Sequence, residues 1–133
     1  MSHWINLTEF GDNRGKLISV ENMKNIPFKM ERLFYIYDTD TEAVRGKHAN
    51  RNSSFIFICV SGGCDIIVDN GSTLHEYHLD LPTKALYCPK GTWKEMVHFK
   101  PGTVLLVISD QPYDNSEYIR DYTEFKEYCK NHG

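Results

Sequence analysis

Phe55-Ile56-Phe57-Ile58-Cys59-Val60 is the stretch that decides the fold, because it is apolar at every position. Successive side chains of a β-strand point to opposite faces, so this strand would be buried on both sides, as the central strand of a β-sandwich is. Shorter strand-like runs flank it, separated by turns rich in glycine and proline. They cover residues 16–20, 32–37, 65–68, 73–78, 85–88, 94–99 and 103–109. Many short strands with such turns predict an all-β fold, an antiparallel sandwich or barrel.

Two local signals show how this series of strands turns and ends. Asn70-Gly71 predicts a β-hairpin, because both residues tolerate positive φ. Asp121 has the character of a helix N-cap, and Glu124 follows it three residues later. One face of that helix would be shared by Tyr122, Phe125 and Cys129. The sequence therefore predicts one domain over residues 1–133 that ends in a short helix.

Composition and charge exclude several classes of partner. The hydrophobic fraction of 41% and the charged fraction of 25% are ordinary for a globular chain. The net charge of −3 gives no basic field for nucleic acid or for an anionic membrane. No apolar run approaches the roughly 20 residues of a membrane span, and the N-terminus shows no signal peptide. The four cysteines form no CxxC pair and are expected to be reduced thiols. We therefore expect a cytoplasmic protein without a nucleic-acid or membrane partner.

The stretch Arg45-Gly46-Lys47-His48-Ala49-Asn50-Arg51 lies before the core strand and after the aromatic run Leu33-Phe34-Tyr35-Ile36-Tyr37. A glycine turn would thus deliver two arginines, a histidine and an amide to the start of a strand. Arginine side chains suit phosphate groups, and a histidine held on a strand suits proton transfer near neutral pH. The pattern predicts a site that holds a phosphorylated small molecule and moves a proton on it.

Several motifs follow one another in an order that resembles a known family. They are Gly11-Asp12-Asn13-Arg14-Gly15-Lys16-Leu17, Ile26-Pro27-Phe28 with the aromatic run, Arg45 to Asn50, Val60-Ser61-Gly62, Asp69-Asn70-Gly71, Leu86 to Pro89 with Trp93, and Tyr113 with Tyr118-Ile119-Arg120 and Phe125. In this order they resemble the cupin superfamily, and more closely the sugar 3,4-ketoisomerases that act on nucleotide-linked 4-keto-6-deoxyhexoses. The resemblance implies a jelly-roll β-sandwich or barrel and a homodimer. It also implies a thymidine diphosphate (dTDP) 4-keto-6-deoxyglucose substrate, converted to a 3-keto-6-deoxyhexose for unusual deoxysugars of cell-surface glycans.

One departure from the family pattern bears on metal binding. Family members often carry His-Ala-His where this chain has His48-Ala49-Asn50, and an asparagine forms hydrogen bonds but cannot titrate. Metal-binding cupins resemble one another in a His-x-His pair, a nearby glutamate and a later histidine, whose position here holds Lys94. His75 and His78 would point to opposite faces of a strand and do not replace the missing ligands. One ligand remains of the three or four that a divalent metal needs, so we expect no metal and no other cofactor.

The chemistry implied by the resemblance assigns roles to single residues. Moving a ketone from C4 to C3 needs a base for the C3 proton, a proton donor for the oxygen and protection from water. His48, with an ordinary pKa of ~6.5, is expected to be the base. Tyr35 would be the neutral donor to the oxyanion, with Tyr37 on the same face as the reserve. Arg45 and Arg51 would hold the diphosphate or polarise the ketone. Further substrate contacts are expected from Asn50, Arg14, Arg32 and Lys94.

Two other functions stay open on the sequence. A 3,5-epimerase acting on the same 4-keto sugar uses similar enolate chemistry, and a non-catalytic cupin would bind a nucleotide sugar without converting it. The short chain and the aromatic strand before His48 favour the ketoisomerase. The segment Trp4-Ile5-Asn6-Leu7 alternates apolar and polar residues as an edge strand does. We therefore expect this segment at or near the interface of a homodimer.

Overall fold

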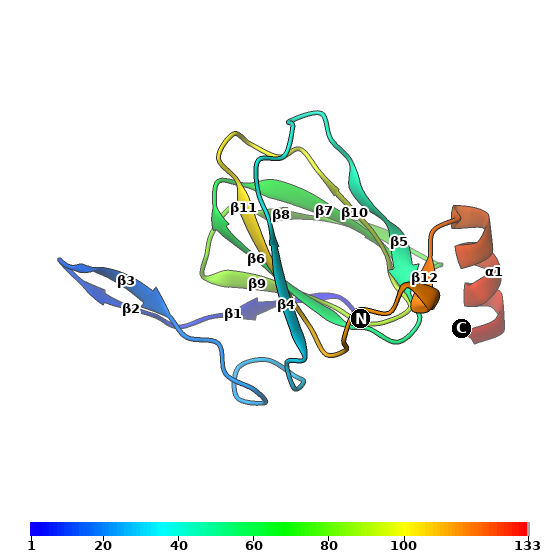
Figure 1. Ribbon diagram of the computed structural model, residues 1–133, viewed down its shortest axis with the longest axis horizontal. Helices are drawn as coiled ribbons and strands as arrows, with labels where there is room; N and C mark the ends of the chain where they lie inside the picture. Colours follow the sequence, from blue (N-terminus) through cyan, green and yellow to red (C-terminus); the bar gives the residue numbers. More distant parts are fainter. Residues whose placement is uncertain (133) are drawn as a thin grey trace.

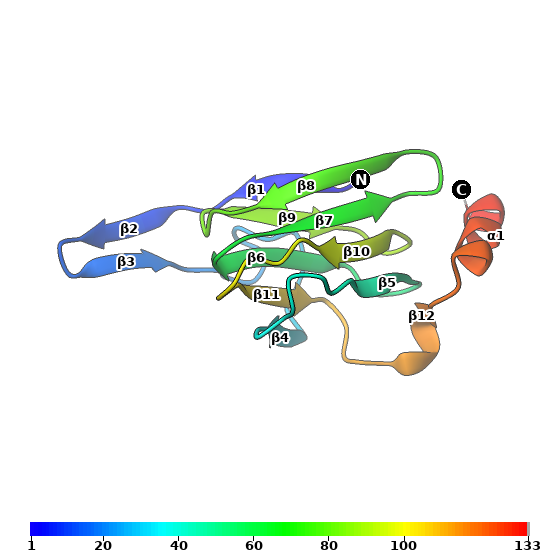
Figure 2. The same ribbon diagram turned by 90° about the horizontal axis from the view of Figure 1, so that it is seen from above.

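The computed structural model describes residues 1–132, and most of its regular structure is antiparallel β-strand (Figure 1). One sheet contains, in spatial order, β1 (His3–Asn6), β9 (Lys84–Cys88), β6 (Phe55–Ser61), β11 (Val104–Ser109) and β4 (Arg32–Ile36). The other contains β12 (Tyr118–Ile119), β5 (Arg45–Asn50), β10 (Trp93–Val97), β7 (Cys64–Asp69) and β8 (Leu74–Leu79). The two sheets form the layers of a jelly-roll β-sandwich (Figure 2). This architecture confirms the predicted all-β class.

β6 lies in the middle of its sheet, as its composition predicts, and both of its faces are buried. Phe55, Phe57 and Cys59 belong to the core between the two sheets. Ile56 and Ile58 belong to a second core on the other side of the strand. That second core is completed by apolar residues from the N-terminal part of the chain, among them Leu7, Ile26 and Phe28. Each large side chain buried in this way stabilises the fold by ~1.5–3 kcal/mol, so β6 holds both layers of packing together.

The predicted hairpin joins β7 to β8, although its turn differs from the one that the Asn-Gly pair favours. Only Gly71 of the pair has a positive φ, of 96°. Asn70 instead uses its side-chain Oδ1 to accept hydrogen bonds from the backbone N–H groups of Ser72 and Thr73, each at 2.9 Å. The asparagine therefore stabilises the loop through its side chain rather than through a left-handed backbone.

The predicted C-terminal helix is α1 (Tyr122–His132), and it begins at the predicted N-cap. The Asp121 Oδ1 atom accepts a hydrogen bond from the N–H of Thr123 at 2.8 Å, which satisfies one of the free donors of the first turn. The buried ring of Phe125 packs against Trp93 of β10, with ring centroids 5.7 Å apart. The helix therefore sits against one end of the barrel, where β5, β10 and β12 meet it (Figure 1).

The stretch expected to be a turn before the core strand is itself a strand, β5, and it lies in the opposite sheet from β6. The ladder between β5 and β10 shifts register between Lys94 and Glu95, whose partners are His48 and Gly46. Lys47 is the extra residue of this β-bulge, and both it and Gly46 have positive φ, of 58° and 81°. A side chain on Gly46 would also meet the Lys94 carbonyl oxygen at 2.9 Å. The glycine therefore permits a bulged strand at this position rather than a turn.

A second hairpin, formed by β2 (Glu9–Asp12) and β3 (Gly15–Ile18), projects from the barrel at the end opposite α1 (Figure 1). All of its strand residues except Ile18 are exposed, including the apolar Phe10 and Leu17. β1 forms one edge of its sheet, as the alternation of its sequence predicts, and among the described residues it pairs with β9 alone. The remaining regular element is a single 3-10 turn, η1 (Asn115–Glu117). Within residues 1–132, no helix has the length and apolar character needed to cross a membrane.

Candidate active site

A cavity of about 150 Å³ lies between the two sheets. Strands β4, β5, β6 and β10 supply most of its walls, because their alternate side chains point into the sandwich. It is lined by Phe34, Ile36, Arg45, Gly46, His48, Phe55, Phe57, Lys94, Met96 and Tyr118. The lining is mostly apolar, with one imidazole, one ammonium, one guanidinium and one phenol. Such a cavity excludes water while presenting a few polar groups to a ligand.

His48 and Lys94 are directly opposite each other in the ladder between β5 and β10. Burial disfavours the charged imidazole, and the positive charge of Lys94 adds to this effect, so together they lower the pKa of His48 to about 4. His48 is therefore neutral at physiological pH and can accept a proton. This part of the sequence prediction, a base on β5, is consistent with its surroundings.

Lys94 is one of the most deeply buried polar residues of the described chain, with 1% of its surface exposed. Burial lowers the pKa of its ammonium to about 8. Its Nζ atom donates hydrogen bonds to Asn50 Oδ1 at 3.3 Å and to the Thr92 carbonyl oxygen at 3.2 Å, and it lies 4.7 Å from the centre of the Phe55 ring. Lys94 is thus mostly protonated at neutral pH and can still give up its proton.

Asn50 lies behind Lys94 and connects it to a buried carboxylate. Its Nδ2 atom donates to Glu117 Oε2 at 2.9 Å. Glu117 also accepts hydrogen bonds from the Ser53 hydroxyl and from the backbone N–H groups of Asn52 and Ser53. Burial tends to raise the pKa of this carboxyl, but the hydrogen bonds outweigh it and the pKa is lowered. Asn50 therefore orients Lys94 rather than lining the cavity. Glu117, which sequence reasoning missed, fixes the end of β5 and the residues that follow it.

The structure does not bring Tyr35 or Tyr37 to His48. Phe34 and Ile36 line the cavity, so Tyr35 of β4 points outward and is 60% exposed, and Tyr37, which follows the strand, is 61% exposed. The phenol beside the base is instead Tyr118 of β12, whose ring centroid lies 4.8 Å from that of His48. The Tyr118 ring is placed there because β12 pairs with the end of β5. Within its own chain, Tyr35 therefore points away from the imidazole, and Tyr118 is the phenol that lies next to it.

The four predicted arginines fall into two groups. Arg45 lines the cavity, and the Nη2 atom of Arg32 donates to Tyr118 Oη at 3.4 Å. The buried Nε of Arg32 finds no hydrogen-bond partner within residues 1–132. Arg51 instead pairs with Glu124 of α1 at 3.1 Å, outside the cavity. Arg14 lies in the turn of the projecting hairpin, bound to Asp12 at 2.6 Å, and is remote from the cavity of its own chain.

The residues of the cavity do not fit a divalent metal. A metal site needs three or four donors, such as imidazole nitrogens and carboxylate oxygens. The lining offers one imidazole and no carboxylate, and it places the ammonium of Lys94 next to that imidazole. This donor set favours proton transfer over metal coordination.

The fold is the jelly roll of a cupin. Its cavity holds a neutral imidazole beside a buried ammonium and a phenol, groups that suit acid–base chemistry. Comparison with known proteins places the chain more narrowly. It belongs to the family described as FdtA, WxcM-like, C-terminal, whose model matches residues 1–130.

Its relatives share nearly their whole length with it. It is 40% identical over 124 residues to TDP-4-oxo-6-deoxy-alpha-D-glucose-3,4-oxoisomerase of Aneurinibacillus thermoaerophilus. The matched region covers 93% of this chain and 89% of the relative. It is similar to the crystal structure of WlaRB, the TDP-quinovose 3,4-ketoisomerase of Campylobacter jejuni, with a TM-score of 0.91, 42% identity and coverage of 95% and 97%. It is also similar to QdtA, a sugar 3,4-ketoisomerase of Thermoanaerobacterium thermosaccharolyticum solved with TDP, with a TM-score of 0.95, 30% identity and coverage of 98% and 96%.

Proposed function

We propose that this protein converts dTDP-4-keto-6-deoxyglucose into a dTDP-3-keto-6-deoxyhexose through an enediol intermediate. The observation that carries the proposal is the pairing of His48 with the buried Lys94 in a cavity of about 150 Å³. Neutral His48 can take a proton, and protonated Lys94 can give one. The full-length relatives are 3,4-ketoisomerases, which makes the protein an isomerase of this class. A variant of QdtA was solved with TDP-4-keto-6-deoxyglucose itself, which supports the choice of substrate.

The reaction takes four proton transfers, two that form the enediol and two that convert it to the 3-ketone, and the residues of the cavity balance all of them. Neutral His48 takes the C3 proton, the C3–H electron pair forms a C3–C4 double bond, and O4 receives the ketone electrons together with a proton from Lys94. The O3 proton then passes to Lys94 as C3 becomes a ketone, and His48 returns its proton to C4. Tyr118 donates a second hydrogen bond to the developing oxyanion. Both residues end in their starting states, so no redox cofactor takes part.

The size of the cavity divides the substrate into two parts. Sites for drug-sized ligands measure ~300–1,000 Å³, so a cavity of about 150 Å³ holds the sugar ring and leaves the nucleotide outside. Arg45 and Arg32 stand next to the reactive residues with free donor capacity, and they are placed to bind the diphosphate. Arg51, engaged with Glu124, has a structural role in this proposal.

We also propose that the protein is a cytoplasmic homodimer. β1, with the segment from Trp4 to Leu7, leaves one edge of its sheet unpaired within the described chain, and the projecting hairpin exposes Phe10 and Leu17. A second copy of the chain would cover both. Arg14 would then meet a substrate only in the barrel of the other subunit. The four free cysteines suit a reducing compartment.

One experiment separates this proposal from its two competitors. The protein is incubated with dTDP-4-keto-6-deoxyglucose in deuterated water, and the ring protons are followed by NMR. We expect the C3 proton signal to disappear as a new 3-keto product appears, in which C4 carries the transferred hydrogen or a deuterium from the solvent. Exchange that includes C5, without a 3-keto product, would identify a 3,5-epimerase, and binding without exchange would identify a non-catalytic nucleotide-sugar cupin. Either of these results would overturn the proposal.

A further inference from the structure

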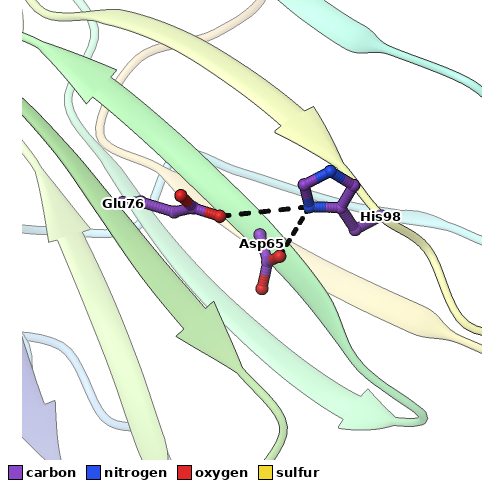
Figure 3. A group of neighbouring side chains, drawn as sticks. All are labelled: Asp65, Glu76 and His98. Carbon is purple, nitrogen blue, oxygen red and sulfur yellow. Dashed lines mark hydrogen bonds and ion pairs between the residues drawn. The ribbon is translucent and has the colours of Figure 1, made fainter.

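A group of titratable side chains lies on the outer face of the second sheet, away from the cavity (Figure 3). Ile66 and Val68 of β7 point into the core, so Asp65 of the same strand points outward. The register places His78 of β8 directly opposite Asp65, and Val97 of β10 opposite it on the other side. His98, which follows Val97, and Glu76, two residues before His78, complete the group. Three neighbouring segments thus converge on one carboxylate.

The potential ligand atoms point toward one another. His98 Nδ1 lies 2.7 Å from Asp65 Oδ2 and 3.9 Å from Glu76 Oε1, as the dashed lines of Figure 3 show. One ligand atom from each of these three residues lies within 4.8 Å of the other two. Asp65 and His98, together with His78, also line a solvent-open hollow of about 300 Å³. A cation can therefore reach the group without any rearrangement of the fold.

We propose that Asp65, Glu76 and His98 form a binding site for a divalent transition-metal cation such as zinc, separate from the active site. Imidazole and carboxylate are ligands that such cations prefer. Ligands of a tetrahedral zinc ion, each ~2.0–2.1 Å from the metal, lie ~3.3 Å from one another. The distances of 2.7 and 3.9 Å bracket this value, so small side-chain movements complete the geometry. Water fills the fourth position, and the two carboxylates balance the charge of the ion.

His78 positions the central carboxylate. Its Nδ1 atom lies 2.6 Å from Asp65 Oδ1, the oxygen that does not face His98. Holding one oxygen leaves the other directed at the proposed metal, as partners of ligating groups do in known metal sites. An ion bound here would link β7, β8 and the segment after β10. Because it binds only the folded chain, it would raise the melting temperature.

Zinc titration of the metal-free protein tests this site. We expect isothermal titration calorimetry to show zinc binding that weakens at least tenfold in His98→Asn and in Glu76→Gln. Asparagine suits position 98 because the backbone there has a φ of 55°, which asparagine tolerates. The zinc-dependent rise in melting temperature should be lost in the same two variants. The matched control is His75→Asn, an exposed histidine of β8 outside the group, which should bind zinc as the wild type does.

Zinc held by other groups, such as the partly exposed Cys129, would survive in His98→Asn. Equal affinity in the wild type and in His98→Asn would therefore overturn the proposal, as would an absence of binding to the wild type at millimolar zinc. In crystals grown with zinc, we expect an anomalous difference peak between Asp65, Glu76 and His98. A peak elsewhere and none at this position would equally show that the group is only an ion-pair cluster.

Discussion

His48 lines the cavity and is not part of the hydrophobic core clusters, so its substitution should separate chemistry from binding. In His48→Asn we expect turnover of the keto sugar to fall by ~10²–10⁴, the usual effect of losing a general base. Nucleotide-sugar affinity and melting temperature should stay close to those of the wild type. His75→Asn makes the same change outside the cavity and should keep full activity. Turnover within a few-fold of the wild type in His48→Asn would contradict the assignment.

The charge of Lys94 sets the pH range of the proposed reaction. The reaction needs neutral His48, with a pKa of about 4, and protonated Lys94, with a pKa of about 8. The wild-type kcat/KM should therefore rise through about pH 4 and fall through about pH 8. Lys94→Met removes the proton donor for O4, so kcat/KM should fall by ~10²–10⁴, and the alkaline fall should disappear from the activity that remains. The acid limb should move to higher pH, because removing the positive charge of Lys94 raises the pKa of His48. That pKa should stay below ~6.5, because the imidazole is still buried.

Lys90→Met is the control for that profile, because Lys90 lies outside the cavity. It should leave both limbs unchanged. An unaltered pH profile in Lys94→Met would show that the ammonium does not act on the imidazole.

The sequence singles out His48 of the cavity but not the phenol that lies next to it, and the reason is physical. In the run from Leu33 to Tyr37 both sets of alternate residues are apolar or aromatic, so nothing in the pattern distinguishes the inner face from the outer one. Tyr118 lies 70 residues after His48 and reaches it only through the short pairing of β12 with β5. Side chains joined by such long-range pairing are not visible to local patterns.

At the level of elements, the end of β5 depends on a single carboxylate. Glu117 accepts hydrogen bonds from Asn50, the last residue of β5, and from Asn52 and Ser53, which follow it. We expect Glu117→Gln to lower the free energy of unfolding by about 2 kcal/mol, the scale of hydrogen bonds to a charged group, as measured by urea denaturation. The difference should shrink below the lowered pKa of Glu117, where the wild-type carboxyl is also neutral.

Glu127→Gln is the matched control, because Glu127 is exposed on α1 and its one ion pair within residues 1–132 is with Lys130. It should change stability by less than ~0.5 kcal/mol. Equal effects of the two substitutions would show that Glu117 is not the anchor described above.

Strands and helices with a distinctive local composition can be predicted from the sequence, whereas β5 could not. The apolar β6 and the N-capped α1 lie where the sequence places them. β5 contains a glycine, three charged or polar side chains and a histidine, a composition that reads as a turn. It becomes a strand because β10 and β12 pair with it on either side. Tertiary pairing overrides local propensity here.

At the level of the whole molecule, the projecting hairpin gives the most direct test of assembly. Light scattering at micromolar concentration should give about twice the chain mass of 15.5 kDa. Replacing the exposed Phe10 and Leu17 with serine removes apolar surface without touching the core, and it should shift the protein toward monomer. Deleting residues 1–8, which removes the edge strand β1, should also weaken the dimer.

Leu74→Ser is the control, because Leu74 is equally exposed but lies at the start of β8. It should leave the mass unchanged. A monomeric wild type, or a hairpin variant that dimerises unchanged, would contradict the proposed assembly.

The extra residue in β5 has a consequence for how the site tolerates insertions and deletions. Arg45 and His48 are three residues apart, so in a regular strand they would point to opposite sides of the sheet. Because Lys47 adds one step, both side chains line the same cavity. Deleting Lys47 would restore regular alternation and turn Arg45 to solvent while His48 kept its partner Lys94. The number of residues in this strand thus determines which side chains line the cavity. Deleting the exposed Lys47 would change the cavity as a substitution of one of its lining residues does.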